Sequence, residues 1–298
     1  MLDRASTFAQ PEIVALLKKH FVPVALDQAN QRRQKDTEGE FYRKIANQSP
    51  RNNFNRTTQG FYIATAAGKL LLYNNNRDPE KVLRLMREKL AEFDQEHRDT
   101  PTEQIVSTSV DSRYTMTPPE GGLVVRVRAK VLDGYEPTSN RWQRIFQTAL
   151  SRDNLWITAK EHRQLASGVF PETLIERIAR FHMVDNTRGE PRMWKRKEIK
   201  SATIQVSDGG KLSGSIRISN AQSGYEAQLR GQIEVTSGKV TKLEMVALGE
   251  YWGEGPYTKN APEGRFPLGI AFTLADGTNI ADDLAPQGAR GWLEGYLK

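Results

Sequence analysis

The chain has 298 residues, a net charge of +7 at neutral pH and no cysteine. Without cysteine it forms no disulfide and offers no thiolate nucleophile and no cysteine-ligated zinc or iron–sulfur site. Its 38% apolar content is typical of a soluble globular protein, and its length predicts two domains. The basic charge is spread thinly, so the dense basic surface of a nucleic-acid-binding protein is not expected.

Targeting signals are not evident in the sequence. No apolar run approaches the length of a membrane span, and the residues after Met1 lack the apolar core of a signal peptide. As written, the chain is expected to be cytoplasmic. It would be extracytoplasmic if Met1 replaces a removed leader, so the compartment stays open.

The first apolar patterns predict a helix, a strand and a second helix. Pro11 to His20 carry apolar residues at helical spacing. Residues 21–26 follow as a continuous apolar run, which is typical of a strand buried on both faces. Pro23 removes one backbone donor and favours an edge or end position for that strand. After a polar loop, residues 39–48 are expected to form a short helix.

A hairpin and a covering helix follow. Apolar strands are expected over residues 61–64 and 70–73, joined by a turn in which Gly68 can adopt a positive φ. Asp78 is expected to cap a helix that starts at Pro79 and runs to about Phe93. Its apolar residues recur at helical spacing, which predicts one face packed on the hairpin: Val82, Met86, Leu90 and Phe93.

This order of elements over residues 1–98 resembles the thioredoxin-like superfamily after its first strand. The resemblance rests on an acidic residue, a leucine pair, an aromatic–valine strand start and an aspartate at the strand end: Glu12, Leu16, Leu17, Phe21, Val22 and Asp27. It implies an α/β thioredoxin-like fold for an N-terminal domain of residues 1–98.

Two functional features of that family are missing. Its Cys-x-x-Cys pair lies at the start of the first helix, but residues 2–7 contain no cysteine. Its cis-proline position corresponds here to Gln59. Thiol–disulfide exchange is therefore not expected, and the scaffold predicts non-catalytic binding of a protein partner or a small ligand through the two domains. One alternative is a thiol–disulfide redox protein whose cysteine-bearing segment precedes Met1.

Residues 99–121 are rich in acidic, hydroxyl and proline residues and are expected to link two domains. A C-terminal domain of residues 122–298 is predicted to be α+β and mainly antiparallel, either a sandwich or a partial barrel around a helix. Residues 123–132 alternate apolar and basic side chains, as in a strand with one wet face. Further strands and helices are expected: strands over residues 199–206, 214–219, 227–235, 240–249 and 268–274, and helices over residues 159–166 and 171–184.

The first candidate site follows the helix predicted over residues 171–184. His182 lies at its C-terminal end, where a protonated imidazole is favoured. Asp185 can orient or neutralise the imidazole, and Arg188 is a candidate ligand contact. The competing interpretation is a capped helix end with a satisfied histidine.

The second candidate site follows an apolar strand. Glu250 and Glu254 flank Tyr251 and Trp252 on a glycine-rich loop. Paired carboxylates serve acid–base chemistry on a sugar, and the aromatic rings are candidate ligand contacts. The competing interpretation is a loop packed by its aromatics. A hydrolase is therefore a second alternative function, with four candidate catalytic residues: His182, Asp185, Glu250 and Glu254. No metal or cofactor is predicted, because no metal-ligand or phosphate-loop spacing is present.

Overall fold

The computed structural model describes residues 6–96 and 110–298. The chain divides into two compact units, a smaller one within residues 3–116 and a larger one from Thr117 to Lys298. Residues 99–109 of the predicted linker lie outside the described residues. Each unit is considered by itself below.

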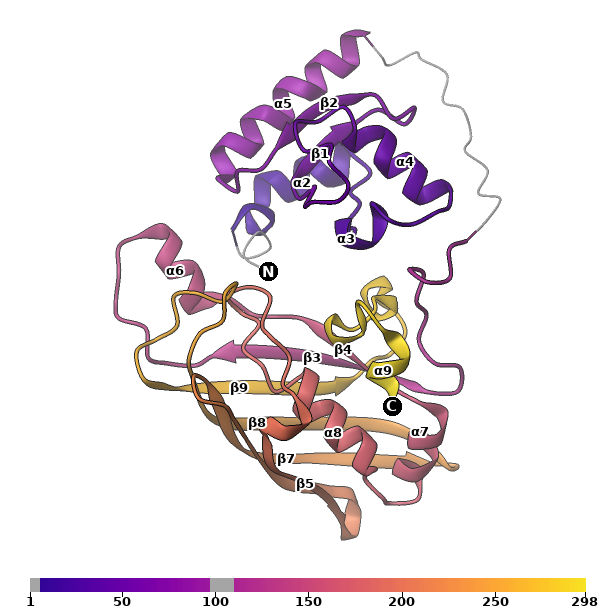
Figure 1. The fold of residues 1–298 in the computed structure, drawn as a ribbon, viewed down its shortest axis with the longest axis vertical. Coiled ribbons are helices and arrows are strands. Elements are labelled where there is room, and N and C mark those ends of the chain that lie inside the picture. Colours follow the sequence, from indigo (N-terminus) through magenta and orange to yellow (C-terminus); the bar gives the residue numbers. More distant parts are fainter. Residues whose placement is uncertain (1–5, 97–109) are drawn as a thin grey trace. The chain divides into compact units, whose positions relative to one another are not determined.

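The smaller unit combines a hairpin with several helices (Figure 1). The antiparallel hairpin pairs Phe61 with Asn74, and its turn holds Gly68 at a φ of 80°. The predicted hairpin and long helix are confirmed. The elements of this unit are η1 (Thr7–Ala9), α2 (Pro11–His20), α3 (Gln28–Gln31), α4 (Thr37–Ala46), β1 (Phe61–Ala64), β2 (Leu70–Asn74) and α5 (Pro79–Glu96).

A small apolar core joins two helices to the hairpin. Ile13 of α2 packs with Val82 and Met86 of α5, and Phe61 and Ile63 of β1 lie against them. The apolar stripe of α5 therefore faces inward as its spacing predicts. Asp78 accepts a hydrogen bond from the backbone N–H of Lys81 at 2.9 Å, which caps the first turn of α5.

The prediction of a buried strand over residues 21–26 is wrong. Within the described residues of this unit the sheet consists of β1 and β2 alone. The side chains of Val22, Val24 and Leu26 are 90%, 71% and 46% exposed. A strand buried on both faces needs neighbouring strands and a covering layer, and the described residues supply neither for this run. The chain has the expected mixture of helices and strands, but the expected thioredoxin-like sheet is not observed in the described residues.

The larger unit is built on a curled sheet of seven strands in the order β4-β3-β9-β8-β7-β6-β5 (Figure 1). Each neighbouring pair is antiparallel, which confirms the predicted mainly antiparallel domain. The strands are β3 (Leu123–Val131), β4 (Asp153–Ile157), β5 (Ile199–Ser207), β6 (Lys211–Ser219), β7 (Gly224–Thr236), β8 (Lys239–Trp252) and β9 (Arg265–Leu274).

Alternation along the strands fixes which face is buried. In β3 the side chains of Val125 and Val127 are buried, whereas Arg128 and Lys130 are exposed. Successive strand residues point to opposite faces, so one face of the sheet carries the core and the other is solvated.

Helices cover the inner face of the sheet. The helix α8 packs on β5 and buries Leu174 and Ile178. A capping box between Thr158 and Glu161 starts α7. The helical segments are α6 (Arg141–Thr148), α7 (Ala159–Ala166), α8 (Glu172–Phe181), η2 (Arg196–Glu198), η3 (Asp208–Gly210), η4 (Ile280–Asp283), η5 (Gln287–Ala289) and α9 (Leu293–Leu297). None of the helices in the described residues is both long and apolar enough to span a membrane.

Candidate functional site

His182 lies in a buried cluster at the end of α8. Its Nε2 is 2.7 Å from the hydroxyl oxygen of Tyr296 in α9, and its Nδ1 is 3.3 Å from Oδ2 of Asp153 in β4. All three residues are shielded from solvent. Burial raises the pKa of the Tyr296 phenol well above its ordinary value. The hydroxyl is therefore neutral, and the contacts join the end of α9 to the sheet.

A second buried group adjoins this cluster. The guanidinium of Arg177 in α8 binds Glu161 of α7 through two contacts, Nη1–Oε2 at 2.7 Å and Nη2–Oε1 at 3.0 Å. Its Nε donates to the carbonyl oxygen of Tyr296 at 2.8 Å. Burial alone raises the pKa of Glu161, but the hydrogen bonds and charge of Arg177 outweigh it and hold this pKa below its ordinary value. The sequence gives no signal for this pair beyond the capping-box position of Glu161.

Asp185 and Arg188 form a separate buried pair. Arg188 Nε donates to Asp185 Oδ2 at 2.8 Å, and Thr187 donates its backbone N–H and its hydroxyl to Oδ1. Glu254 reaches the same guanidinium, with Oε1 3.9 Å from Nη1. Backbone donation from Ala261 is the main cause that lowers the pKa of Glu254. Glu254 of the second predicted site therefore contacts Arg188 of the first, and Arg188 in turn pairs with Asp185.

Of the other residues predicted for the second site, Tyr251 contacts the backbone of Asp185, whereas Glu250 and Trp252 lie in other contacts. Glu250 is on the solvated face of the sheet, with Oε2 3.4 Å from Arg265 Nη1. The indole of Trp252 is covered by the guanidinium of Arg265, 4.0 Å from the ring centroid. Tyr251 is buried among core aromatics. Because Tyr251 and Trp252 are consecutive in β8, they point to opposite faces and do not form one stacking surface.

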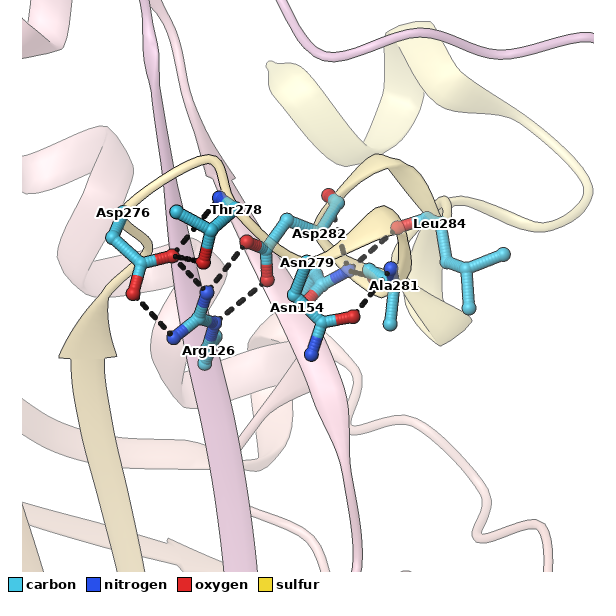
Figure 2. Close-up of polar contacts among 8 residues, drawn as sticks. All are labelled: Arg126, Asn154, Asp276, Thr278, Asn279, Ala281, Asp282 and Leu284. Atoms are coloured by element: carbon cyan, nitrogen blue, oxygen red, sulfur yellow. Dashed lines mark hydrogen bonds and ion pairs between the residues drawn. The ribbon is translucent and has the colours of Figure 1, made fainter.

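A fourth polar group, which the sequence did not suggest, ties the segment after β9 to the sheet (Figure 2). Arg126 of β3 donates from Nε to Asp282 at 2.7 Å and from Nη2 to Asp276 at 2.6 Å. Hydrogen bonds from Arg126 are the main cause that lowers the pKa of Asp276. Asn154 of β4 donates to the carbonyl oxygens of Ala281 at 2.7 Å and Leu284 at 2.9 Å.

These groups are ion pairs and hydrogen bonds among the protein's own residues. Within residues 6–96 and 110–298, no three histidine or acidic side chains are arranged to hold a metal ion. Their common role is to join segments that are distant in sequence. The candidate catalytic residues are therefore distributed over separate structural contacts.

The most exposed apolar surface of the smaller unit is the run of residues 22–26, here called the exposed segment; Phe21, which precedes it, packs against the small core. Among the described residues, no hydrogen bond joins positions 22–26 to another part of the chain. Lys18 and Lys19 precede it at the exposed end of α2, and Arg33 and Lys35 follow it. In the sequence, the exposed apolar side chains therefore lie between two pairs of exposed basic residues, with Asp27 directly after Leu26.

Comparison of the chain with protein-family models, with curated proteins and with solved structures finds no match.

Proposed function

We propose that this chain is a non-catalytic binding protein whose smaller unit holds an extended segment of a protein partner along the exposed segment. The observation that carries this proposal is the exposure of Val22 and Val24 on a run without hydrogen bonds to the described residues. Thiol chemistry is not proposed for these 298 residues, because they contain no cysteine.

The chemistry of the exposed segment indicates what it would bind. An extended chain binds a second extended chain through backbone hydrogen bonds, and alternate side chains supply specificity. Val22, Val24 and Leu26 are two residues apart, so in an extended conformation they lie on one side. The basic residues at both ends favour a partner with acidic residues around alternating apolar positions.

A thioredoxin-like ancestry is part of the same proposal. It is supported by the order of helices and hairpin from α2 to α5 and by the packing of α5 on β1. In such a scaffold the exposed segment occupies the position of a sheet strand. A strand donated by a partner would supply the neighbour that residues 22–26 lack among the described residues.

The hydrolase alternative has weaker support. Of its four candidate residues, Asp185 and Glu254 approach the same guanidinium, that of Arg188. His182 and Glu250 lie in other contacts.

The proposal is tested with a fluorescent peptide of eight residues that alternates valine and glutamate, followed by fluorescence polarisation. We expect V22S/V24S to weaken binding by about tenfold or more, because each valine that becomes buried contributes about 1.5 kcal/mol and 1.4 kcal/mol is a factor of ten. A peptide that alternates valine and lysine is expected to bind more weakly than the acidic one.

The matched control is Val169→Ser, because Val169 is an exposed valine of the larger unit. This variant is expected to bind the acidic peptide as the parent protein does. Equal binding of the acidic and basic peptides, or unchanged binding by V22S/V24S, would contradict the proposal.

A further inference from the structure

The two edges of the seven-stranded sheet differ. At one edge, the residues of β4 from Asn154 onward are buried. The segment from η4 to α9 lies on this edge (Figure 1). Asn154 donates to the carbonyl oxygens of Ala281 and Leu284 (Figure 2). Asp153 accepts from the backbone N–H of Gln287 at 2.9 Å, and the hydroxyl of Tyr296 accepts from the backbone N–H of Trp156 at 3.4 Å. The backbone N–H and carbonyl oxygen of Trp156 on this edge are already bonded, to the hydroxyl of Tyr296 and to Arg177.

At the other edge, β5 pairs with β6 on one side and with no other strand of the described residues. Residues 201–207 read Ser-Ala-Thr-Ile-Gln-Val-Ser and contain neither a charge nor a proline. Charges, prolines and bulges are the usual protections of an exposed edge. Here a bulge and Lys200 protect only the start of the strand, where the register shifts between Ile199 and Ser201.

Hollows follow the same strand. One of about 540 Å³ lies between α8 and β5 and is lined by Phe170, Ile175 and Ile204. Another of about 500 Å³ adjoins Val206, where β5 ends. The lining of the first hollow also includes the charged side chains of Glu176 and Arg196, so the space beside β5 is of mixed polarity and open to an added strand.

We infer that the occupant of this edge is β5 of a second copy of the chain, paired antiparallel about Ile204. The residue pattern around Ile204 is the same in both directions. In this register Thr203 lies opposite Gln205 of the second copy, and Ala202 opposite Val206. Each pair joins residues of like polarity on one face, and the two-fold axis makes the contact self-complementary.

The charges at the ends of β5 favour the same register. With Ile204 on the axis, Lys200 of one copy comes to the same end of the contact as Asp208 of the other, which follows the last residue of β5. Both residues are exposed, and neither has an ion pair within the described residues. The chain as a whole carries +7, which opposes self-association, so an uncharged strand with complementary ends is the arrangement that limits repulsion.

The test measures the mass of the protein by size-exclusion chromatography with light scattering. The parent protein is expected at twice its 33.7 kDa chain mass. T203K/Q205K places lysine opposite lysine in both copies, and T203E/Q205E places glutamate opposite glutamate. Each variant alone is expected at 33.7 kDa, and an equimolar mixture is expected to return to the doubled mass.

Controls separate this contact from general effects of charge and folding. Gln228 and Thr241 are exposed on inner strands, so Q228K/T241K adds the same charge and is expected to leave the doubled mass unchanged. T203K/Q205E pairs opposite charges across the axis and is expected to remain dimeric. A parent protein that stays at the single-chain mass overturns the inference, as does a doubled mass that T203K/Q205K leaves intact.

The absence of native cysteine permits a direct test of the register. T203C/Q205C is expected to give a covalent dimer under mild oxidation, seen on a non-reducing gel, because residues 203 and 205 face each other across the axis. Q228C/T241C is expected to stay monomeric on the same gel. A failure of T203C/Q205C to cross-link overturns the register. Neither test depends on the exposed segment of the smaller unit.

Discussion

Arg177 and Glu161 form a two-point ion pair inside the larger unit, with side chains that are 1% and 4% exposed. The pair joins α8 to α7, and the same guanidinium reaches the last turn of α9 through the carbonyl oxygen of Tyr296. Three helices are thus held by one charged side chain.

Arg177→Met removes the cation and leaves Glu161 buried without its partner. We expect it to lower the free energy of unfolding by about 3–5 kcal/mol, measured by urea denaturation. Arg180→Met is the matched control, because Arg180 pairs with a partly exposed Glu176 at 3.2 Å. It is expected to cost less than about 1 kcal/mol. Similar losses of unfolding free energy in Arg177→Met and Arg180→Met would contradict the larger stabilising role of the buried Arg177–Glu161 pair.

Because folding lowers the pKa of Glu161, the free energy of unfolding is expected to depend on pH. Its pKa in the folded protein is below the ordinary value of 4.5, so in acid the unfolded chain binds its proton first. The stabilisation is present above about pH 4.5 and is lost as the pH falls through the folded-state pKa. The difference in unfolding free energy between the parent and Glu161→Gln is therefore expected to shrink between about pH 6 and pH 3.

The control for that titration is Glu234→Gln, an exposed carboxylate 3.2 Å from Lys242. Its difference from the parent protein is expected to be small across the same pH range. A Glu161→Gln difference that stays constant or grows in acid would show that the pKa of Glu161 is not lowered by folding.

Tyr296→Phe removes the hydroxyl that contacts His182 at 2.7 Å. The imidazole nitrogen is then buried without that partner, and we expect a loss of about 1–3 kcal/mol in the free energy of unfolding. Tyr257→Phe, at an exposed tyrosine, is expected to change it by less than about 0.5 kcal/mol. Unchanged stability in Tyr296→Phe would argue against a structural role for His182.

Asn154→Ala removes the amide that holds the carbonyl oxygens of Ala281 and Leu284. We expect faster amide hydrogen exchange in residues 276–287, because the segment loses its anchor on β4. Asn140→Ala, which removes the cap of α6, is expected to leave exchange in residues 276–287 unchanged. Equal amide hydrogen exchange of residues 276–287 in Asn154→Ala and the parent protein would show that Asn154 does not hold this segment on β4.

The sequence predicted those elements whose signal is local. Gly68 marked the hairpin turn, and the alternation of valines with basic residues marked β3. The prediction of a buried strand over residues 21–26 failed because an apolar run is buried only if other segments of the chain cover it. The strand β4 was missed because its residues are nearly all buried and show no alternation.

The candidate sites depended on contacts that sequence spacing does not reveal. His182 was correctly placed at a helix end, but its partner Tyr296 is 114 residues later. Arg126 contacts Asp282 across 156 residues. The grouping of Asp185 with Arg188 was accessible because the two are only three residues apart.

The packing of the η4–α9 region on β4 also limits how far the sheet can be extended by further copies of the chain. A sheet that accepted strands at both margins would add copies indefinitely and form fibrils. Here only the β5 edge of the described sheet is open. When two copies pair through it, neither copy has an open edge left for a third. If copies pair through β5, the anchoring of the C-terminal region by Asn154 and Arg126 keeps the opposite edge covered, so the assembly ends at two chains.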